Sequence, residues 1–317
     1  MKAAFLDYET MGPGLKLDGL RAVVSSLQVW DNTSDAELAE RLQGIECVFT
    51  NKIRLTEELL RKVPQLRFIG LTATGSDNID LKAARAHGIV VTNVRNYCTN
   101  SVAEHVIGVM LMLAHSLSHY HASVRAGDWQ KSDIPFLLAH PVVELHGKTL
   151  GIVGYGALGK GVANIARALG MQILVSARRG QSPAPEGRVV FDELLASADV
   201  ISLHCPLTND TRNLIGATEL AAMKSTAMLI NTARGGLVDS AALAAALTDR
   251  TIAAAAVDVL PTEPPVDGDP LLDYTGHNLV VTPHIAWSSD AARQNAIDEL
   301  ARNTSAFIAG ENRNQIT

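Results

Sequence analysis

The feature that most constrains the fold of this chain is a glycine-rich turn set between a short apolar run and a helical segment. The run 149–153 leads directly into Gly154, Gly156 and Gly159, which have the spacing G-x-G-x-x-G, and a helical pattern follows over residues 160–169. Glycine at these positions permits a tight turn, a close approach of the backbone to a pyrophosphate, and close packing of helix on strand. A lone match is weak, but this strand–turn–helix context predicts a dinucleotide-binding unit.

Short apolar runs alternate with helical segments over most of the chain. The runs that we expect to form strands cover residues 3–6, 47–49, 68–71, 90–92, 149–153, 173–175, 200–203, 227–230, 254–257 and 279–281. Continuous apolar runs are typical of parallel strands covered by helices on both faces. The pattern predicts an α/β protein with two doubly wound parallel-sheet domains. The first would span residues 1–98 and be completed by 288–317, and the second would span 99–287.

Composition and charge narrow the classes of partner. The 317-residue chain has a net charge of -6, which disfavours binding to nucleic acid phosphates. Its three cysteines lie far apart, so their spacing indicates neither a disulfide framework nor a zinc site. No run of about 18 uncharged apolar residues occurs, and an acid at position 7 interrupts the N-terminal apolar residues. We therefore expect a cytoplasmic protein without a metal, a nucleic acid partner or a membrane span.

The end of the second strand after the glycine turn carries information about the cofactor. In dinucleotide-binding units an acidic residue at this strand end binds the adenosine ribose hydroxyls. Here the strand ends in Ser176, Ala177, Arg178 and Arg179, with alanine at the expected acidic position. The loss of an acid and the presence of two guanidinium groups favour a 2′-phosphate. The sequence predicts a preference for NADP, with NAD also possible, although a solvated basic turn would have the same composition.

Three charged residues follow the last apolar runs of the second domain. Arg234, Glu263 and His284 come after the runs at 227–230, 254–257 and 279–281. In an open α/β sheet, ligands bind outside the carboxyl ends of the strands, so these side chains are expected to converge on one crevice.

These residue types suit the reduction of a 2-keto acid. A histidine can donate a proton to the carbonyl oxygen, and a neighbouring carboxylate stabilises and orients the imidazolium. A guanidinium can bind the substrate carboxylate and polarise the keto group, while the cofactor supplies the hydride. Each residue alone also has an ordinary structural interpretation, and only their joint placement behind a dinucleotide turn favours catalysis.

The sequence resembles the D-isomer-specific 2-hydroxyacid dehydrogenase family almost from end to end, and glyoxylate/hydroxypyruvate reductases and glycerate dehydrogenases most of all. The segments that carry the resemblance are 101–105, 204–208, 231–235, 258–264 and 283–287. The resemblance implies a flavodoxin-like substrate domain, a Rossmann dinucleotide domain with a dimerisation arm, and a homodimer. It also implies hydride transfer between NAD(P)H and carbon 2 of a small 2-keto or D-2-hydroxy acid.

The resemblance assigns roles to residues of this chain. It implies Arg234 as the substrate binder, Glu263 as the partner of His284, and His284 as the acid/base; substrate contacts are expected from Thr74, Gly75, Arg234, His284 and Trp287. Asp258 is expected to contact the nicotinamide carboxamide. The cofactor residues expected in all are Val102, Gly154, Gly156, Ala157, Leu158, Gly159, Ser176, Arg178, Arg179, Cys205, Pro206, Thr211, Thr232, Ala233, Arg234, Asp258 and His284.

Two alternatives remain open at the level of the sequence. A dinucleotide-sensing, corepressor-like binding protein would also keep the glycine turn and the three charged residues, but this chain lacks a basic patch and low-complexity tails. A phosphoglycerate dehydrogenase would share the whole catalytic pattern. A steady-state screen of small 2-keto acids with both reduced cofactors would separate these alternatives.

Overall fold

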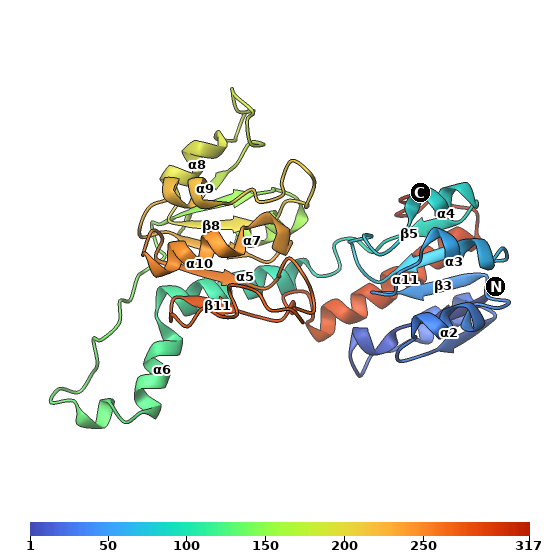
Figure 1. The fold of residues 1–317 in the computed structure, drawn as a ribbon, viewed down its shortest axis with the longest axis horizontal. Helices are drawn as coiled ribbons and strands as arrows, with labels where there is room; N and C mark the ends of the chain where they lie inside the picture. The colour runs from blue at the N-terminus through green and yellow to red at the C-terminus, as the bar shows by residue number, and fades with distance from the viewer. The chain divides into compact units, whose positions relative to one another are not determined.

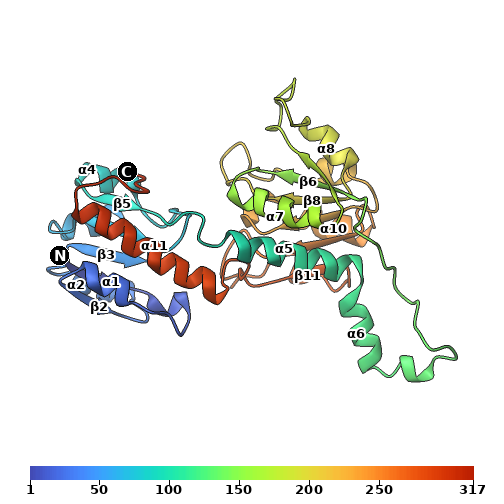
Figure 2. The ribbon, with the colours of Figure 1, turned by 180° about the vertical axis from the view of Figure 1, so that it is seen from behind.

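The computed structural model describes all residues from 1 to 317, and the chain divides into two compact units. Unit 1 comprises Met1–Cys98 together with Ser288–Thr317, and unit 2 comprises Thr99–Trp287. Each unit contains one parallel β-sheet with helices on both faces, so the expected α/β class with two doubly wound domains is confirmed (Figures 1 and 2).

Unit 2 contains a six-stranded sheet in the order β11-β10-β9-β8-β6-β7. Its strands are β6 (Thr149–Val153), β7 (Gln172–Val175), β8 (Val200–Leu203), β9 (Met228–Asn231), β10 (Ala254–Val257) and β11 (Leu279–Val281). A single parallel bridge between Ser176 and Val189 extends the sheet beyond β7. With that bridge as a reduced strand, the strand order is that of the nucleotide-binding doubly wound fold, and the order reverses between β6 and β8.

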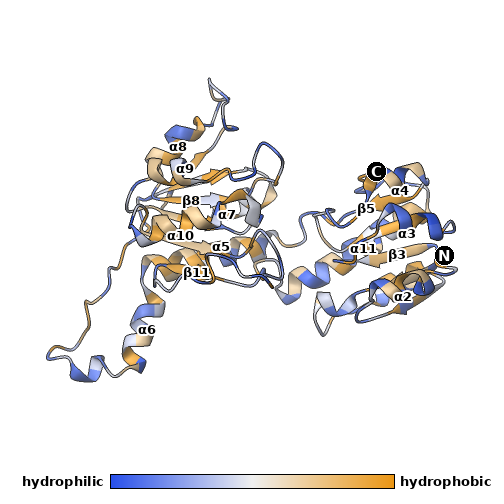
Figure 3. Ribbon diagram, in the orientation of Figure 1, coloured by the Kyte–Doolittle hydropathy of each residue, from blue (hydrophilic) through white to orange (hydrophobic).

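Two layers of helices bury the sheet of unit 2. The helices are α5 (Thr99–Ala114), α6 (Leu117–Arg125), α7 (Ala157–Ala168), α8 (Phe191–Ser197), α9 (Ala217–Ala222) and α10 (Ser240–Thr248), with short 3-10 turns η2 (Trp129–Lys131) and η3 (Gly235–Leu237). Helices α5 and α7 pack together on one face, and α8, α9 and α10 form the other layer. The central strands β8, β9 and β10 are buried at every position, which explains their continuous apolar runs (Figure 3).

Unit 1 contains a five-stranded parallel sheet in the order β2-β1-β3-β4-β5. The strands are β1 (Lys2–Phe5), β2 (Ser26–Val29), β3 (Cys47–Thr50), β4 (Phe68–Leu71) and β5 (Val90–Thr92). The helices are α1 (Asp18–Val23), α2 (Asp35–Arg41), α3 (Glu57–Lys62), α4 (Leu81–Ala86) and α11 (Asp290–Ile308), with a 3-10 turn η1 (Tyr8–Met11). This strand order is that of the flavodoxin-like fold.

The C-terminal helix α11 completes the core of unit 1. It lies across β4 beside α1, and Phe307 stacks on Phe68 at a ring-centroid distance of 4.8 Å. Gly70 makes this packing possible, because a Cβ atom there would lie 2.3 Å from a methyl group of Leu300. After α11 the chain adds to the sheet edge, where Gln315 pairs with Thr92 of β5.

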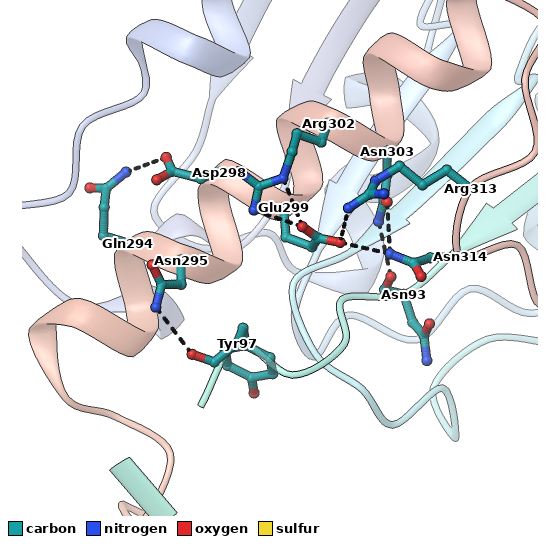
Figure 4. Close-up of polar contacts among 10 residues, drawn as sticks. All are labelled: Asn93, Tyr97, Gln294, Asn295, Asp298, Glu299, Arg302, Asn303, Arg313 and Asn314. Atoms are coloured by element: carbon teal, nitrogen blue, oxygen red, sulfur yellow. Dashed lines mark hydrogen bonds and ion pairs between the residues drawn. The ribbon is translucent and has the colours of Figure 1, made fainter. Parts of the chain in front are cut away.

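Partly buried polar contacts join Glu299, in the middle of α11, to the segment that follows the helix (Figure 4). The carboxylate of Glu299, on a side chain that is 11% exposed, pairs with Arg302 at 2.7 Å and with Arg313 at 2.5 Å. It also accepts a hydrogen bond from the Asn314 side chain at 2.8 Å. Burial raises the pKa of Glu299, but these hydrogen bonds and charges outweigh burial and hold the pKa below its ordinary value.

Local structure differs from the sequence patterns at two points. Residues 101–120 have the pattern of one long helix but form two, because Ser116 adopts the left-handed backbone conformation (φ 50°) between α5 and α6. The strand β2 was missed because it lies at the sheet edge and is only half-buried at alternate positions, so it has no continuous apolar run.

No single helix has both the length and the hydropathy that a membrane span needs; α5 and α6 meet both requirements only as a pair, which is bent by 59°.

We expect Glu299→Gln to lower the thermal midpoint Tm by about 4–8 °C, because net loss of charge-assisted hydrogen bonds costs about 2 kcal/mol. Since the pKa of Glu299 is lowered in the folded protein, this stabilisation is complete above the ordinary glutamate value of 4.5 and is lost as pH falls through the lowered pKa. The Tm difference between wild type and variant, measured by calorimetry, should therefore shrink in acid. Glu311→Gln, at an exposed position just after α11, is the control; an equal effect there would contradict the role of Glu299.

Candidate active site

The carboxyl ends of three neighbouring strands bring the predicted catalytic segments to one edge of the unit 2 sheet. In the register of β9, β10 and β11, Asn231 pairs with Val257, and Val257 pairs with Val281. Arg234 lies three residues past the first of these positions and His284 three residues past the last. The loop that carries Glu263 starts between them, after β10.

A turn held by Asn231 presents Arg234. The fully buried Asn231 side chain donates to the Arg234 carbonyl at 2.9 Å and accepts from the Ala233 N–H at 3.1 Å. The next residue, Gly235, lies against the backbone of Leu260, where a Cβ atom would approach within 1.9 Å. No other residue fits there, so the Arg234 turn is packed directly on the loop that leads to Glu263.

Glu263 and His284 are in hydrogen-bonding contact, as the sequence predicts. Glu263 Oε2 lies 2.5 Å from His284 Nδ1, and Glu263 Oε1 accepts the Leu260 N–H at 2.8 Å. Both side chains keep about a third of their surface exposed, at 34% and 30%. With Nδ1 bound to the carboxylate, Nε2 is the ring nitrogen that can exchange a proton with a substrate.

His284 has a backbone conformation that needs support. Its φ of 57° is left-handed, which costs a residue other than glycine roughly 1–2 kcal/mol. The support comes from Asp258, which is 2% exposed and accepts the N–H groups of Ile285 at Oδ1 and Ala286 at Oδ2, both at 2.9 Å. The carbonyl of Asp258 accepts the His284 N–H at 2.8 Å. Asp258 therefore shapes the loop that carries the histidine.

The glycine turn forms an open cradle at the start of α7. Gly154 has a φ of 99°, and a Cβ atom there would lie 2.5 Å from the backbone of His204 and Cys205. Gly159 packs against the Gly154 carbonyl, whereas Gly156 faces open space with no atom within 4 Å of a Cβ position. The residues of this turn thus fit a pyrophosphate approaching the free N–H groups of the α7 N-terminus.

A cavity of about 630 Å³ continues from the glycine turn. It is lined by Val153, Gly154, Tyr155, Gly156, Ser176, Ala177, Arg178, Arg179, Arg188, Phe191, Cys205, Pro206, Thr208, Asp210, Thr211 and Leu214. The lining thus joins the ends of β6, β7 and β8, on both sides of the point where the strand order reverses, which is where such sheets bind nucleotides. Its size and mixed lining fit the adenosine half of a dinucleotide.

The arginines of this cavity are not equivalent. Arg179 forms an ion pair with Glu219, which is only 9% exposed on its side chain. Arg178 is exposed and has no ion pair. Arg188, which the sequence analysis did not single out, donates to the Ser176 carbonyl at 2.9 Å and so lies at the end of β7. It was missed because it comes twelve residues after Ser176, in a loop outside the recognised motif.

Other expected cofactor residues are distributed around these two features. Ala157 and Leu158 begin α7 beyond the glycine turn, and Thr232 and Ala233 belong to the Arg234 turn. Val102 is 3% exposed inside α5, so its side chain packs in the core. Trp287 is half-buried and ends unit 2.

Burial suppresses the ionisation of the titratable groups next to the cavity. It lowers the pKa of His204 to about 4, so this imidazole is neutral near pH 7. Burial also raises the pKa of the Cys205 thiol. All three cysteines are unpaired, and burial raises the pKa of Cys47 to about 12. His204 and Cys205 therefore add no charge to the cavity, where the charged lining residues are its arginines and Asp210, whereas Cys47 lies in unit 1.

The predicted carboxylate-binding turn of unit 1 follows β4. Asn93 donates to the Thr74 carbonyl at 2.7 Å, and the Thr74 hydroxyl donates to the Val94 carbonyl at 2.8 Å. Backbone hydrogen bonds of this turn use the N–H groups of Thr72 and Ile79, and those of Thr74 and Gly75 are not among them. Two adjacent N–H groups in a braced turn are suited to an anion.

Comparison with known proteins agrees with this geometry. The model of the D-isomer specific 2-hydroxyacid dehydrogenase NAD-binding domain matches residues 107–286. A glycerate dehydrogenase of Methylorubrum extorquens is 48% identical over 280 residues, which cover 88% of each chain. A hydroxypyruvate reductase of Blautia hydrogenotrophica is 36% identical over 98% of each chain. A solved glyoxylate reductase from Paecilomyes thermophila superposes with a TM-score of 0.84 at 28% identity, covering 100% of this chain and 98% of that one.

The chain belongs to the D-isomer-specific 2-hydroxyacid dehydrogenase family. This confirms the resemblance found in the sequence and the expected reaction class, hydride transfer between a nicotinamide dinucleotide and a 2-keto or D-2-hydroxy acid. In this chain the Glu263–His284 pair and the glycine cradle lie in the same unit, at the carboxyl edge of one sheet.

Proposed function

We propose that this dehydrogenase reduces hydroxypyruvate and glyoxylate, with NADPH as the preferred cofactor. The observation that carries the proposal is the 2.5 Å contact between Glu263 and His284 beside the Arg234 turn. The names of the relatives support the substrate class, since they include a hydroxypyruvate reductase and glyoxylate reductases. A corepressor-like protein that only senses the dinucleotide would have no need of this ordered acid/base pair.

The proposed roles rest on the Glu263–His284 contact and on the chemistry of the other side chains. The nicotinamide, when bound, supplies the hydride to carbon 2. His284 Nε2 donates the proton to the keto oxygen, while Glu263 holds Nδ1 and stabilises the imidazolium that gives up the proton. Arg234 binds the substrate carboxylate through its guanidinium, and Trp287 limits the size of the acid that can bind. In unit 1, Thr74 and Gly75 remain proposed carboxylate donors through their N–H groups.

We expect His284→Ala to lower kcat for hydroxypyruvate reduction by about 10²–10⁴-fold, which is the usual contribution of a general acid. The Kd for NADPH, measured by fluorescence, should change by less than about threefold, because the cradle of the glycine turn is unaltered. Glu263→Gln should have a smaller effect on kcat, because an amide oxygen can still accept the Nδ1 hydrogen bond but carries no charge.

The surface substitution His87→Ala, at the end of α4 in unit 1, serves as the control and should leave kcat unchanged. Near-normal kcat in His284→Ala would contradict the role of this histidine. Tight NADPH binding by the wild type without turnover of any small 2-keto acid would instead favour the binding-protein alternative.

The proposed preference for NADPH rests on Arg178 and Arg188, and not on the adjacent residues Arg178 and Arg179. Arg178 is free of ion pairs, and Arg188 is directed to the strand end by its bond to Ser176. Arg179 is already neutralised by Glu219. Position 177, where an acidic residue is expected, is alanine, so no carboxylate at this position repels a 2′-phosphate.

Arg178→Ala/Arg188→Ala should reduce the NADPH-over-NADH ratio of kcat/KM by about tenfold or more, since one charge-assisted contact contributes about 1.5–3 kcal/mol. The kcat/KM with NADH should change little. The control is Arg179→Ala/Glu219→Gln, which removes both members of the ion pair and should leave the ratio within about threefold. Equal or better use of NADH by the wild type would refute the preference. If the control variant lowers the NADPH-over-NADH ratio as much as Arg178→Ala/Arg188→Ala does, Arg179 also contributes to binding the 2′-phosphate.

We also propose that the protein forms a homodimer through the arm formed by α6 and residues 126–147. The arm projects from the body of unit 2 (Figures 1 and 2). Eight of the twelve exposed large apolar residues lie on it, namely Leu117, Val124, Trp129, Ile134, Phe136, Leu138, Val142 and Val143. The arm is braced rather than loose, since Tyr120 donates to the His140 carbonyl at 2.6 Å. A second copy of the chain is the partner that would cover this apolar surface.

Sedimentation equilibrium at micromolar concentration should give about twice the chain mass of 33.8 kDa. Phe136→Asp should shift the equilibrium to monomer, because the side chain is 52% exposed and a charge would be buried in the interface. Val266→Asp, at an apolar position that is 81% exposed outside the arm, should leave the dimer intact. A single 33.8 kDa species for the wild type would contradict the homodimer.

A further inference from the structure

The catalytic loop of residues 282–287 is attached to helix α5 at two points. Ser101 Oγ donates to the Ala286 carbonyl at 2.7 Å. One helical turn later, His105 Nε2 lies 3.3 Å from Thr282 Oγ1. Residues four apart lie on the same face of a helix, so this face of α5 contacts the loop on either side of His284.

The contacts of Thr282 determine which group donates to which. Thr282 Oγ1 donates to Asp258 Oδ1 at 2.5 Å, because a carboxylate can only accept. The lone pairs of Thr282 Oγ1 are then left to accept the N–H of His105 Nε2. The relay runs from His105 through the Thr282 hydroxyl to the carboxylate of Asp258.

The Asp258 carboxylate, at the end of this relay, is the group that fixes the loop of residues 282–287. The same oxygen of Asp258, Oδ1, also accepts the Ile285 N–H, and the second oxygen accepts the Ala286 N–H. These bonds follow immediately after His284, which holds a left-handed φ of 57°. A residue keeps such a conformation only where its surroundings over-determine it. The side chain of His105 is 16% exposed and its Nε2 lies 3.9 Å from Asp258 Oδ1, so it also limits the room in which that carboxylate can turn.

We propose that Ser101 and His105 are positioning residues that hold His284 in its reactive orientation, Ser101 through the Ala286 carbonyl and His105 through Thr282 and Asp258. Neither residue lines the cofactor cavity. In the sequence, Ser101 and His105 lie outside the predicted catalytic segments. In the structure they contact the loop of residues 282–287. The inference rests on the proposed role of His284 in turnover, but the order of the loop can be measured without turnover.

The test uses variants that separate the hydrogen bond from packing. His105→Leu removes the donor while keeping an apolar side chain of similar size, and His105→Gln keeps a donor near the position of Nε2. Thr282→Val and Thr282→Ser make the matched pair at the next step, since only serine retains the hydroxyl. We expect His105→Leu and Thr282→Val each to lower kcat by about 10- to 100-fold, as a misplaced catalytic group does. The Kd for NADPH should stay within about threefold of wild type, and the Gln and Ser variants should recover most of kcat.

Two further measurements distinguish positioning from a general structural loss. If one relay is involved, the double variant His105→Leu/Thr282→Val should be no slower than the worse single variant. Hydrogen exchange at the Ile285 and Ala286 amides should accelerate in His105→Leu and in Ser101→Ala, with amides of β6 unchanged. Glu104→Gln, in the same turn of α5 but on its exposed side, should change neither kcat nor exchange.

The possible outcomes are decisive. Accelerated exchange at these amides together with lowered kcat supports the proposal. Unchanged exchange in His105→Leu overturns it, as does additive loss in the double variant or a fall in NADPH affinity that parallels the fall in kcat. Accelerated exchange in a protein whose wild type reduces no 2-keto acid would uphold the contacts to the loop and refute the proposed function instead.

Discussion

The carboxylate of Asp258 is the interaction on which the catalytic edge of this protein depends. It is buried, yet it accepts two backbone N–H groups and a hydroxyl, so its charge is compensated within the protein. Its bonds hold His284 in a left-handed backbone conformation that would otherwise be unfavourable. The position of Asp258 is in turn set by the pairing of β9, β10 and β11, which aligns their carboxyl ends. The backbone conformation of His284 is thus a consequence of sheet register, transmitted through the buried carboxylate of Asp258.

Close backbone approaches hold the rest of the site at the same edge. Gly235 seats the Arg234 turn on the backbone of Leu260, and Gly154 seats the dinucleotide turn on that of His204. At both positions a Cβ atom would overlap main-chain atoms, which cannot move aside as a flexible side chain can. The glycine turn and the turn that carries Arg234 are therefore fixed by backbone contacts between neighbouring loops.

Sequence patterns predicted the parts of this structure that depend on local chemistry. Continuous apolar runs identified the buried strands, and the spacing of Gly154, Gly156 and Gly159 identified the cradle, because both follow directly from backbone requirements. Features created by tertiary contact were beyond such patterns. The pairing of Arg179 with Glu219 and the arrival of Arg188 at the end of β7 join segments far apart in the chain, and no spacing encodes them. The contact between α5 and the loop of His284 also joins segments far apart in the chain, so sequence spacing does not predict it. Edge strand β2 was missed because half-burial leaves little apolar signal.

The two units use the reversal point of a parallel sheet in opposite ways. In unit 2 the reversal between β6 and β8 opens into the 630 Å³ cavity, and arginines line its rim. In unit 1 the reversal lies between β1 and β3, where Asp7 is 1% exposed and accepts the N–H groups of Asn51 at 3.0 Å and Lys52 at 2.6 Å. The carboxylate of Asp7 thus takes the place at which an anionic ligand would bind such a sheet. With that position occupied by a side chain of unit 1 itself, the turn after β4 is the candidate for ligand binding in this unit. The same architecture thus has a buried acid at the reversal point of one sheet and a cavity beside a glycine turn at the reversal point of the other.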